Sequence, residues 1–349
     1  MGTKIKILIV GEVSLCAPTR LVYDDLLKLG NEPELIDTLK FFKVSLLNRV
    51  VNKFLKTPHY FGPGVKKLNR FIIERASAGK FEYVLFFKPS LIYPRTILEL
   101  KKSAKILGIY MDHVDFLKSG SDHFYKTLPM FDLYMSTIHS NTEAMYKYGA
   151  KRSTFFPMTA DSTFLHPVEV SPENMKRLGA DVIFIGNYAN EKRADYLERL
   201  CKDGYDVRIY GYGWQNLPAD SCLRRKKRIF KPVLCTDMAE AFSAAKIGMA
   251  FMRECNDEKI GCRTYEIPLC GTFMLHERNK EVEEFLIPDK EAAFFDSYEE
   301  MKSKIDFYLK NPEIRKKVAK AGYERILNCG ELIYDQMRKM PAMLKKELG

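Results

Sequence analysis

Short apolar runs alternate with segments of helical periodicity along the first half of the chain. Pro18 begins a helix whose apolar residues recur every three or four positions up to Gly30, and residues 33–80 contain a strand and two further helices. Apolar strands that alternate with helices are typical of a parallel sheet with right-handed crossovers. The strands predicted in this half lie at 4–10, 83–88, 105–111, 132–137 and 153–158.

The same alternation restarts after the polar, proline-containing segment 166–180, which is the best candidate for a linker. We therefore predict an α/β fold of two facing Rossmann-like domains with parallel sheets, at 1–168 and 177–332. A tail helix at 333–349 is expected to pack back on the first domain. The second domain's strands are predicted at 181–186, 206–211, 228–232, 247–252 and 272–275, with helices near 190–203 and 236–245.

The last two helices before the tail have clear starting signals. Ser297 and Glu300 form a capping-box pattern, and Asn311 followed by Pro312 supplies an N-cap and a proline at the first helical position. We expect these helices to be structural. The residues of the second helix predicted to face the core are Ile314, Val318 and Ala321.

The amino-acid composition indicates a globular protein and argues against a membrane-spanning or disulfide-rich one. The chain has 349 residues, of which 46% are hydrophobic and 29% charged, as in globular proteins. Its longest apolar run falls short of the roughly 18 residues that span a bilayer, and the N-terminal apolar run is too short for a signal peptide. The eight cysteines include no Cys-x-x-Cys pair, which argues against a zinc or disulfide framework. We therefore expect a cytoplasmic protein.

The net charge of +11 indicates an anionic partner. Five consecutive basic residues at 224–228 (RRKKR) are either a solvated loop or a patch that holds the protein peripherally at the inner face of an anionic membrane. Nucleic acid is a poor candidate, because the basic residues lack interleaved aromatic residues or a recognised module.

The stretch 258–275 (EKIGCRTYEIPLCGTFML) carries the strongest chemical signal. It predicts a loop, a short helix stopped at Gly271 and a buried strand. Arg263 and Glu266 are three residues apart, so they share one face of that helix near its amino end, where anions are favoured. Glu258 precedes Glu266 by eight positions.

This stretch, with the Glu-Arg that follows it, resembles the C-terminal half of group 1 glycosyltransferases, in particular a spore-protein-like subset with an Arg-x-Phe-Glu-x₄-Gly signature. The resemblance covers residues 180–330 and implies a GT-B architecture, in which the first domain faces the acceptor and the second binds the nucleotide-sugar. It also implies that Glu266 holds the ribose, that Glu258 faces the donor sugar, and that Arg263 and Tyr265 belong to the nucleotide-sugar site.

The same resemblance points to further positions in the second domain. Gly186 and Asn187 occupy the place of a Gly-Arg pair that serves the diphosphate, with Lys192 or Arg193 as substitutes for the missing arginine. Lys231 and Val233 fall where the family's base-binding loop lies.

Two positions of the first domain are also candidates. Gly11 follows the first strand, in a loop that lacks the G-x-G-x-x-G fingerprint and is either a plain turn or a substrate contact. Asp112 and His113 follow the strand at 105–111, where the resemblance implies a contact to the donor sugar; the alternative is that Asp112 caps the next turn. Asp112 and Asp115 form D-x-x-D, not the D-x-D of metal-dependent glycosyltransferases.

We therefore expect a hexosyltransferase-like enzyme that moves a sugar from a UDP- or GDP-sugar to a saccharide, a lipid-linked or a protein glycan acceptor in cell-surface polysaccharide biosynthesis. No cofactor or metal ion is required on this interpretation, and retention is favoured; if the enzyme inverts, Asp112 is the natural general base. The alternatives are a non-catalytic carbohydrate- or spore-surface protein of the same fold and a nucleotide-sugar epimerase.

Overall fold

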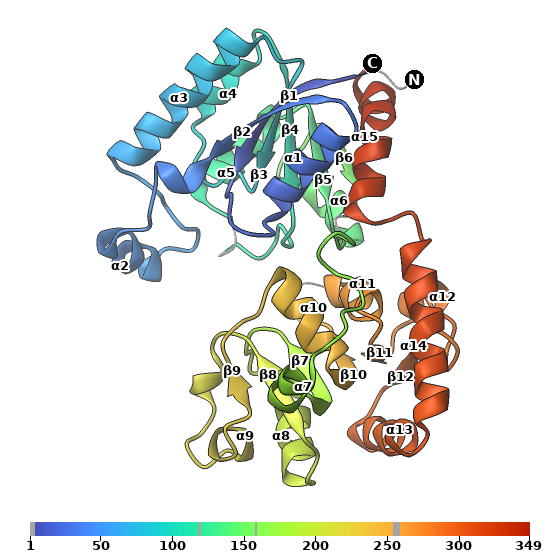
Figure 1. Ribbon diagram of the computed structural model, residues 1–349. Helices are drawn as coiled ribbons and strands as arrows, with labels where there is room; N and C mark the ends of the chain where they lie inside the picture. Colours follow the sequence, from blue (N-terminus) through green and yellow to red (C-terminus); the bar gives the residue numbers. More distant parts are fainter. Residues whose placement is uncertain (1–3, 118–119, 158, 254–258) are drawn as a thin grey trace. The chain divides into compact units, whose positions relative to one another are not determined.

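The computed structural model describes residues 4–117, 120–157, 159–253 and 259–349. These residues form two compact units, which are described separately (Figure 1). Unit 1 contains the described residues of 1–158 and 333–349, and unit 2 those of 159–254 and 258–332. Each unit has a six-stranded parallel sheet, so the predicted α/β fold with two parallel sheets is confirmed.

The sheet of unit 1 has the strand order β2-β1-β3-β4-β5-β6. The strands are β1 (Lys6–Gly11), β2 (Glu32–Asp37), β3 (Tyr83–Phe87), β4 (Lys105–Tyr110), β5 (Leu133–Ser136) and β6 (Ser153–Phe155). The helices are α1 (Pro18–Lys28), α2 (Leu46–Phe54), α3 (Pro63–Gly79), α4 (Pro94–Leu100), α5 (Asp122–Thr127), α6 (His139–Lys147) and α15 (Ile333–Leu348). The tail helix α15 packs against α1, far from it in sequence (Figure 1).

The sheet of unit 2 has the order β12-β11-β10-β7-β8-β9. Its strands are β7 (Ala180–Ile185), β8 (Val207–Tyr210), β9 (Ile229–Phe230), β10 (Ala245–Ala250), β11 (Phe273–Glu277) and β12 (Ala293–Phe295). Its helices are α7 (Pro172–Leu178), α8 (Lys192–Lys202), α9 (Cys222–Arg225), α10 (Cys235–Ser243), α11 (Cys262–Leu269), α12 (Lys280–Phe285), α13 (Tyr298–Lys310) and α14 (Pro312–Leu327).

Both faces of the unit 2 sheet are buried, which explains why its strands are mostly apolar. Along β7, Val182 and Phe184 belong to one core cluster, whereas Ile183 and Ile185 belong to another. Successive side chains of a strand point to opposite faces, so the sheet is covered by helices on each side. Its functional groups can reach solvent at the strand ends.

Two local expectations differ from the structure. The segment 166–180 contains the helix α7, because Ser171 caps its amino end by accepting a hydrogen bond from the Asn174 amide (3.2 Å). Ile314 is 45% exposed, so its predicted inward orientation is wrong. The buried face of α14 instead carries Val318, Ala319, Gly322 and Ile326.

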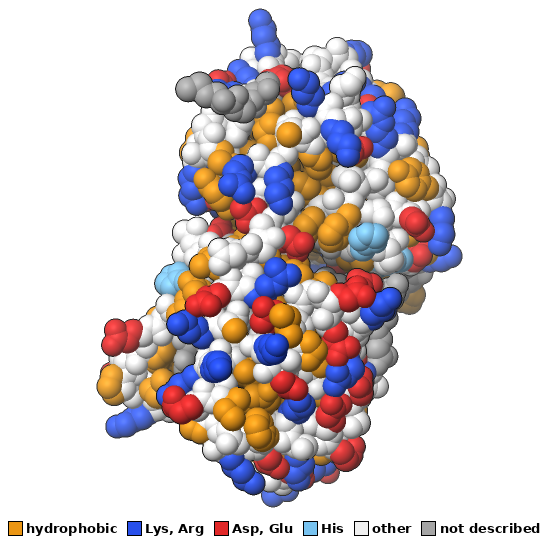
Figure 2. Space-filling model, turned by 90° about the vertical axis from the view of Figure 1, so that its right-hand side faces the viewer, with side chains coloured by type: hydrophobic (Ala, Val, Ile, Leu, Met, Phe, Trp, Pro, Cys, Tyr) orange, Lys and Arg blue, Asp and Glu red, His pale blue; other side chains and the backbone are white. Residues whose placement is uncertain are grey.

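Charge is distributed over the surface in both signs. Figure 2 shows basic and acidic side chains interspersed over one face of the molecule. In the part of the chain that the structure describes, we found no helix with the length and apolar character needed to cross a bilayer.

Candidate functional site

The strand order of unit 2 reverses between β7 and β10, which lie side by side although β8 and β9 separate them in sequence. In an open α/β sheet, ligands bind beyond the carboxyl ends of the strands at such a switch point. The candidate site is therefore formed by α11 and by the loops that follow β7, β10 and β11.

Arg263 and Glu266 lie on one face of α11 and form an ion pair. Arg263 also donates through Nε to the carbonyl oxygen of Ile185 at the end of β7 (2.7 Å). Burial lowers the pKa of Arg263 from its ordinary value of 12.5. The arginine thus fixes the carboxylate at the switch point.

His276, a residue of β11, joins this strand to α11. Its ring is fully buried, with Nδ1 2.5 Å from the Glu277 carbonyl oxygen and Nε2 3.0 Å from the Thr264 hydroxyl. A carbonyl oxygen can only accept, so Nδ1 carries the proton and Nε2 accepts from Thr264. Burial lowers the pKa of His276 to about 4, which keeps the ring neutral at pH 7.

The carboxylate of Glu277 connects three elements at the same edge. Its Oε2 accepts a hydrogen bond from the Met252 amide after β10 (3.1 Å), and its Oε1 pairs with Lys192 at the start of α8. Lys192 is one of the two predicted substitutes for a diphosphate ligand. The other, Arg193, is 4% exposed, and its Nε lies 3.5 Å from a Glu191 carboxylate oxygen.

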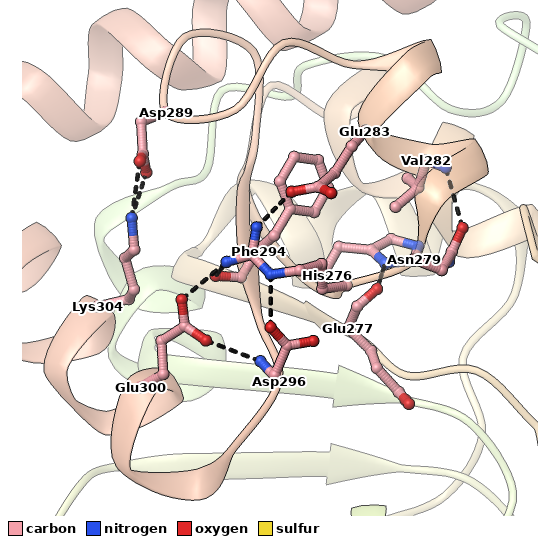
Figure 3. Close-up of polar contacts among 11 residues, drawn as sticks. His276, Glu277, Asn279, Val282, Glu283, Asp289, Phe294, Asp296, Glu300 and Lys304 are labelled. Atoms are coloured by element: carbon pink, nitrogen blue, oxygen red, sulfur yellow. Dashed lines mark hydrogen bonds and ion pairs between the residues drawn. The ribbon is translucent and has the colours of Figure 1, made fainter.

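Arg278 is committed to acidic partners. Its guanidinium pairs with Glu283, Asp296 (2.7 Å) and Glu300 (2.8 Å), and these three acidic residues are labelled in Figure 3. These contacts join the end of β11 to α12, β12 and α13. Arg278 therefore stabilises this edge of the sheet and is not a candidate anion ligand.

The loop at Gly186 and Asn187 is held by the loop after β8. The indole Nε1 of Trp214 donates to the Gly186 carbonyl oxygen (2.8 Å), and the Asn187 Oδ1 accepts from the Tyr212 amide (2.9 Å). A Cβ atom at Gly211 would lie 2.0 Å from the Gly186 carbonyl oxygen, so a glycine is required where the two loops meet. The side-chain oxygen of Asn187 is therefore already hydrogen-bonded within the protein.

The other predicted residues of unit 2 lie in different environments. Lys231 is exposed beyond β9, and Val233 packs against the core. Tyr265 is 3% exposed, and its hydroxyl donates to Glu331 (2.6 Å), so its side chain supports α11 from the core. Glu258 lies outside the described residues.

In unit 1, Asp112 follows β4 and pairs with Lys88, which follows the neighbouring strand β3. The Lys88 backbone has φ 48°, and its amide donates to the Ile109 carbonyl oxygen (3.0 Å). The ion pair places a carboxylate and an ammonium group together at the carboxyl edge of this sheet.

The buried side chain of Asn141 holds the loop that carries Asp112 and His113. Its Oδ1 accepts from the Val114 amide (2.8 Å), and its Nδ2 donates to the Asp112 carbonyl oxygen (3.0 Å). The Nδ1 of His113 accepts from the Asp115 amide (3.3 Å), so the proton of the neutral ring is on Nε2. The side chains of Asp112 and His113 are thereby held on one loop.

A cavity of about 440 Å³ lies at the switch point of the unit 1 sheet, between the ends of β1 and β3. Val10 and Glu12 line it on either side of Gly11. A Cβ atom at Gly11 would lie 2.7 Å from the Thr19 hydroxyl oxygen, so this glycine allows α1 to approach β1 closely. The cavity is also lined by Phe42, Lys43, Arg49, Tyr60 and Lys88.

The basic run 224–228 is largely occupied by internal contacts. Arg224 donates to the Leu217 carbonyl oxygen (2.7 Å), Lys226 donates to the Cys201 carbonyl oxygen (3.0 Å), and Arg228 pairs with Asp206 (2.7 Å). Within the described ranges, no group of three or more histidine, cysteine, aspartate or glutamate residues is arranged to hold a metal ion.

Comparisons with known proteins agree with this arrangement. Residues 192–333 match a family described as glycosyl transferase-like. This region contains the Arg263–Glu266 pair, His276 and Glu277. The search of curated proteins gave no match.

Solved structures share the fold over nearly the whole chain. A glycosyltransferase from Rickettsia africae is 15% identical, with 99% of each chain covered and a TM-score of 0.68. A sucrose-phosphate synthase from Thermosynechococcus elongatus is 12% identical, with 98% of each chain covered and a TM-score of 0.64. The Anabaena HepE protein, solved with UDP-glucose, is 11% identical over 98% of this chain and 100% of that one, with a TM-score of 0.64. The chain thus has the GT-B fold of glycosyltransferases.

Lys88, Asn141 and His276 are among the residues of these sites that were not predicted. Lys88 had a usable signal, because a lysine followed by a proline ends an apolar strand there. Asn141 had none, since its partners lie 27 and 29 residues away in the sequence. His276 stands in an apolar strand, where a buried histidine with satisfied nitrogens is the ordinary interpretation.

Proposed function

We propose that this protein is a glycosyltransferase that moves a hexose from a UDP- or GDP-sugar to a glycan or lipid-linked acceptor. The observation that carries the proposal is the Arg263–Glu266 pair, which is anchored on Ile185 at the switch point of unit 2 and lies in the region that matches the glycosyl transferase-like family. A fixed carboxylate beside a cation and a helix amino end suits a nucleoside diphosphate, which offers ribose hydroxyls and phosphate oxygens.

Each group has a role in this proposal. Glu266 pairs with Arg263 through Oε2, so its Oε1 can accept from the ribose hydroxyls. Arg263 and the amino end of α11 stabilise the negative charge that develops on the departing diphosphate, which removes the need for a metal ion. The backbone at Lys231–Val233 reads the base, and the loop at Gly186 and Asn187 lies against the diphosphate.

The sugar and the acceptor are assigned to the remaining groups. Asp112, His113 and Glu258 face the donor sugar, and the cavity beside Gly11 takes the acceptor. Retention of configuration is proposed from the Glu258–Glu266 spacing; with inversion, Asp112, which pairs with Lys88, is the general base. We place the enzyme in the cytoplasm, in the synthesis of cell-surface polysaccharide.

The test is calorimetry of UDP and GDP binding, with and without a chelator. We expect one of the two nucleotides to bind equally well in both conditions. Strict dependence on a divalent ion would overturn the metal-free mechanism, and no binding of either nucleotide would overturn the proposed donor class. Consumption of the donor sugar by a protein that binds it separates an enzyme from a non-catalytic protein of the same fold.

A Glu266→Gln variant tests the role of the carboxylate. The charged acceptor contributes roughly 1.5–3 kcal/mol to such hydrogen bonds, so nucleotide affinity should fall about ten- to a hundredfold. The loss should be much smaller for a 2′,3′-dideoxy nucleotide, which has no hydroxyl to donate. Glu281→Gln, at an exposed position of α12, is the matched control and should bind as the parent does. Equal losses for ribose and dideoxy nucleotides would show that Glu266 only supports its helix.

A further inference from the structure

The helix α2 exposes its apolar face to solvent. Leu46, Leu47, Val50 and Phe54 are 77%, 60%, 50% and 81% exposed, whereas the polar Asn48 is buried. At 100° per residue, the four apolar side chains fall within about 100° of arc and form one stripe. Figure 1 shows α2 set apart from the sheet of unit 1. An ordinary surface helix has the opposite orientation, so this face is built for a partner.

The partner is anionic, because the surrounding segment is basic throughout. Residues 38–73 contain eight lysines and arginines and no aspartate or glutamate. The basic residues nearest the stripe are exposed and have no acidic partner in the described structure; they are Lys43, Arg49, Lys53 and Lys56. An apolar stripe of leucine and phenylalanine flanked by lysine and arginine is the pattern of a helix that lies in the interface of an anionic bilayer.

We propose that α2 and its basic flanks dock unit 1 on an anionic lipid bilayer. The stripe enters the boundary between headgroups and acyl chains, while the flanking lysines and Arg49 contact lipid phosphates. The segment 224–228 does not form this contact, because three of its five side chains are bound within unit 2.

The docking surface adjoins the cavity of unit 1. Lys43 and Arg49 belong to both, and Phe42 and Tyr60 line the cavity from the same segment. A bilayer in contact with α2 therefore lies beside the cavity to which the proposed function assigns the acceptor. Resting on that proposed function, this adjacency selects the lipid-linked class among the possible acceptors.

Flotation with vesicles tests the docking surface on the full chain, without any nucleotide. Vesicles of phosphatidylcholine with phosphatidylglycerol should carry the protein at low salt, and pure phosphatidylcholine vesicles should carry at least tenfold less. High salt should weaken the binding, because it screens the basic flanks. Equal flotation with both vesicle types, or none with either, would overturn the proposal.

Variants separate the apolar and basic contributions. L47S/F54S and K53Q/K56Q change exposed side chains outside the cavity, and each should lower vesicle affinity about tenfold or more. R225S/K227S, in the basic run of unit 2, is the matched control and should float as the parent does. Unchanged flotation of L47S/F54S, or loss of flotation in R225S/K227S, would contradict the assignment to α2.

Two further measurements keep the outcomes distinct. Sedimentation velocity in the absence of vesicles should show the same mass for the parent and for L47S/F54S; a parent dimer that this variant dissociates would instead assign the stripe to a second copy of the chain and overturn the proposal. Calorimetry with UDP and GDP should give the parent affinity for L47S/F54S, because nucleotide binding belongs to unit 2. Flotation thus reports on membrane docking alone, and calorimetry reports on the proposed nucleotide-sugar donor alone.

Discussion

At the scale of single residues, His276 shows how a buried side chain supports the site without lying in it. Its two nitrogens connect Thr264 of α11 with the Glu277 backbone at the end of β11. The helix that carries Arg263 and Glu266 is thereby fixed to the strand whose last side chain pairs with Lys192. The neutral ring suits this role, because a charged imidazolium would be buried without an ionic partner of its own.

The lowered pKa of His276 makes the free energy of unfolding depend on pH. Its pKa is about 4 in the folded protein and about 6.5 in the unfolded chain, so between these values the unfolded chain binds a proton that the folded protein does not. Stability is therefore complete above pH 6.5 and falls as pH decreases towards 4. Between pH 7 and pH 5 the loss from this group should be about 2 kcal/mol.

Urea unfolding of the parent and of His276→Gln at pH 7 and pH 5 isolates this effect. The variant is less stable at both values, but the difference between its two free energies should be smaller by about 2 kcal/mol. An identical pH dependence in the two proteins would contradict the assignment.

At the scale of elements, the loop after β4 depends on α6. Asn141 lies in the first turn of α6 and bonds to both Asp112 and Val114 on that loop, as well as to Ser136 at the end of β5. An amide with both a donor and an acceptor can satisfy two backbone groups of opposite polarity, which a smaller or apolar side chain cannot. The position of Asp112 and His113 is therefore set by a neighbouring element.

Asn141→Ala should leave these buried backbone groups without partners, at a cost of roughly 1–3 kcal/mol in the free energy of unfolding. Donor turnover should fall as well, because the loop loses its fixed geometry. Thr142→Ala, one position along the same helix and on an exposed hydrogen bond, should stay within about 0.5 kcal/mol of the parent. A parent-like Asn141→Ala protein would show that the loop holds itself in place.

At the scale of the whole molecule, each unit has its own core, and the tail helix belongs to unit 1. Ile333, Met337, Met340 and Leu344 of α15 are buried, and Arg152 donates to the Glu347 carbonyl oxygen (2.5 Å). The single tryptophan of the chain, Trp214, is buried in the core of unit 2. Its fluorescence therefore reports the unfolding of unit 2 alone.

Met340→Ala should destabilise unit 1 by about 2–5 kcal/mol, because it removes a fully buried side chain and leaves a cavity. Circular dichroism should show an earlier transition, while the tryptophan transition keeps its midpoint, as expected for domains with separate cores. Lys346→Ala, at an exposed position of α15, is the control. A tryptophan transition that moves together with the circular dichroism would mean that the units unfold as one.

The α/β class, the two parallel sheets and the face shared by Arg263 and Glu266 could all be predicted from the amino-acid sequence. These features follow from short-range rules: the period of apolar residues, the proline and glycine signals at helix ends, and the spacing of three residues on a helix. Gly271 is an example of such a short-range signal: the turn that ends α11 requires a positive φ at this position (70°), which glycine adopts readily.

The contacts between polar groups and the exposure of apolar faces depend on how the elements pack, and could not be predicted from the sequence. Lys88 pairs with Asp112, and the Val114 amide donates to Asn141, because neighbouring strands end at the same edge of the sheet. No local sequence pattern encodes these contacts. The apolar stripe of α2 is the clearest case. Its sequence specifies an amphipathic helix equally well for either orientation, and only the packing of the surrounding chain, which buries Asn48, turns the stripe towards solvent.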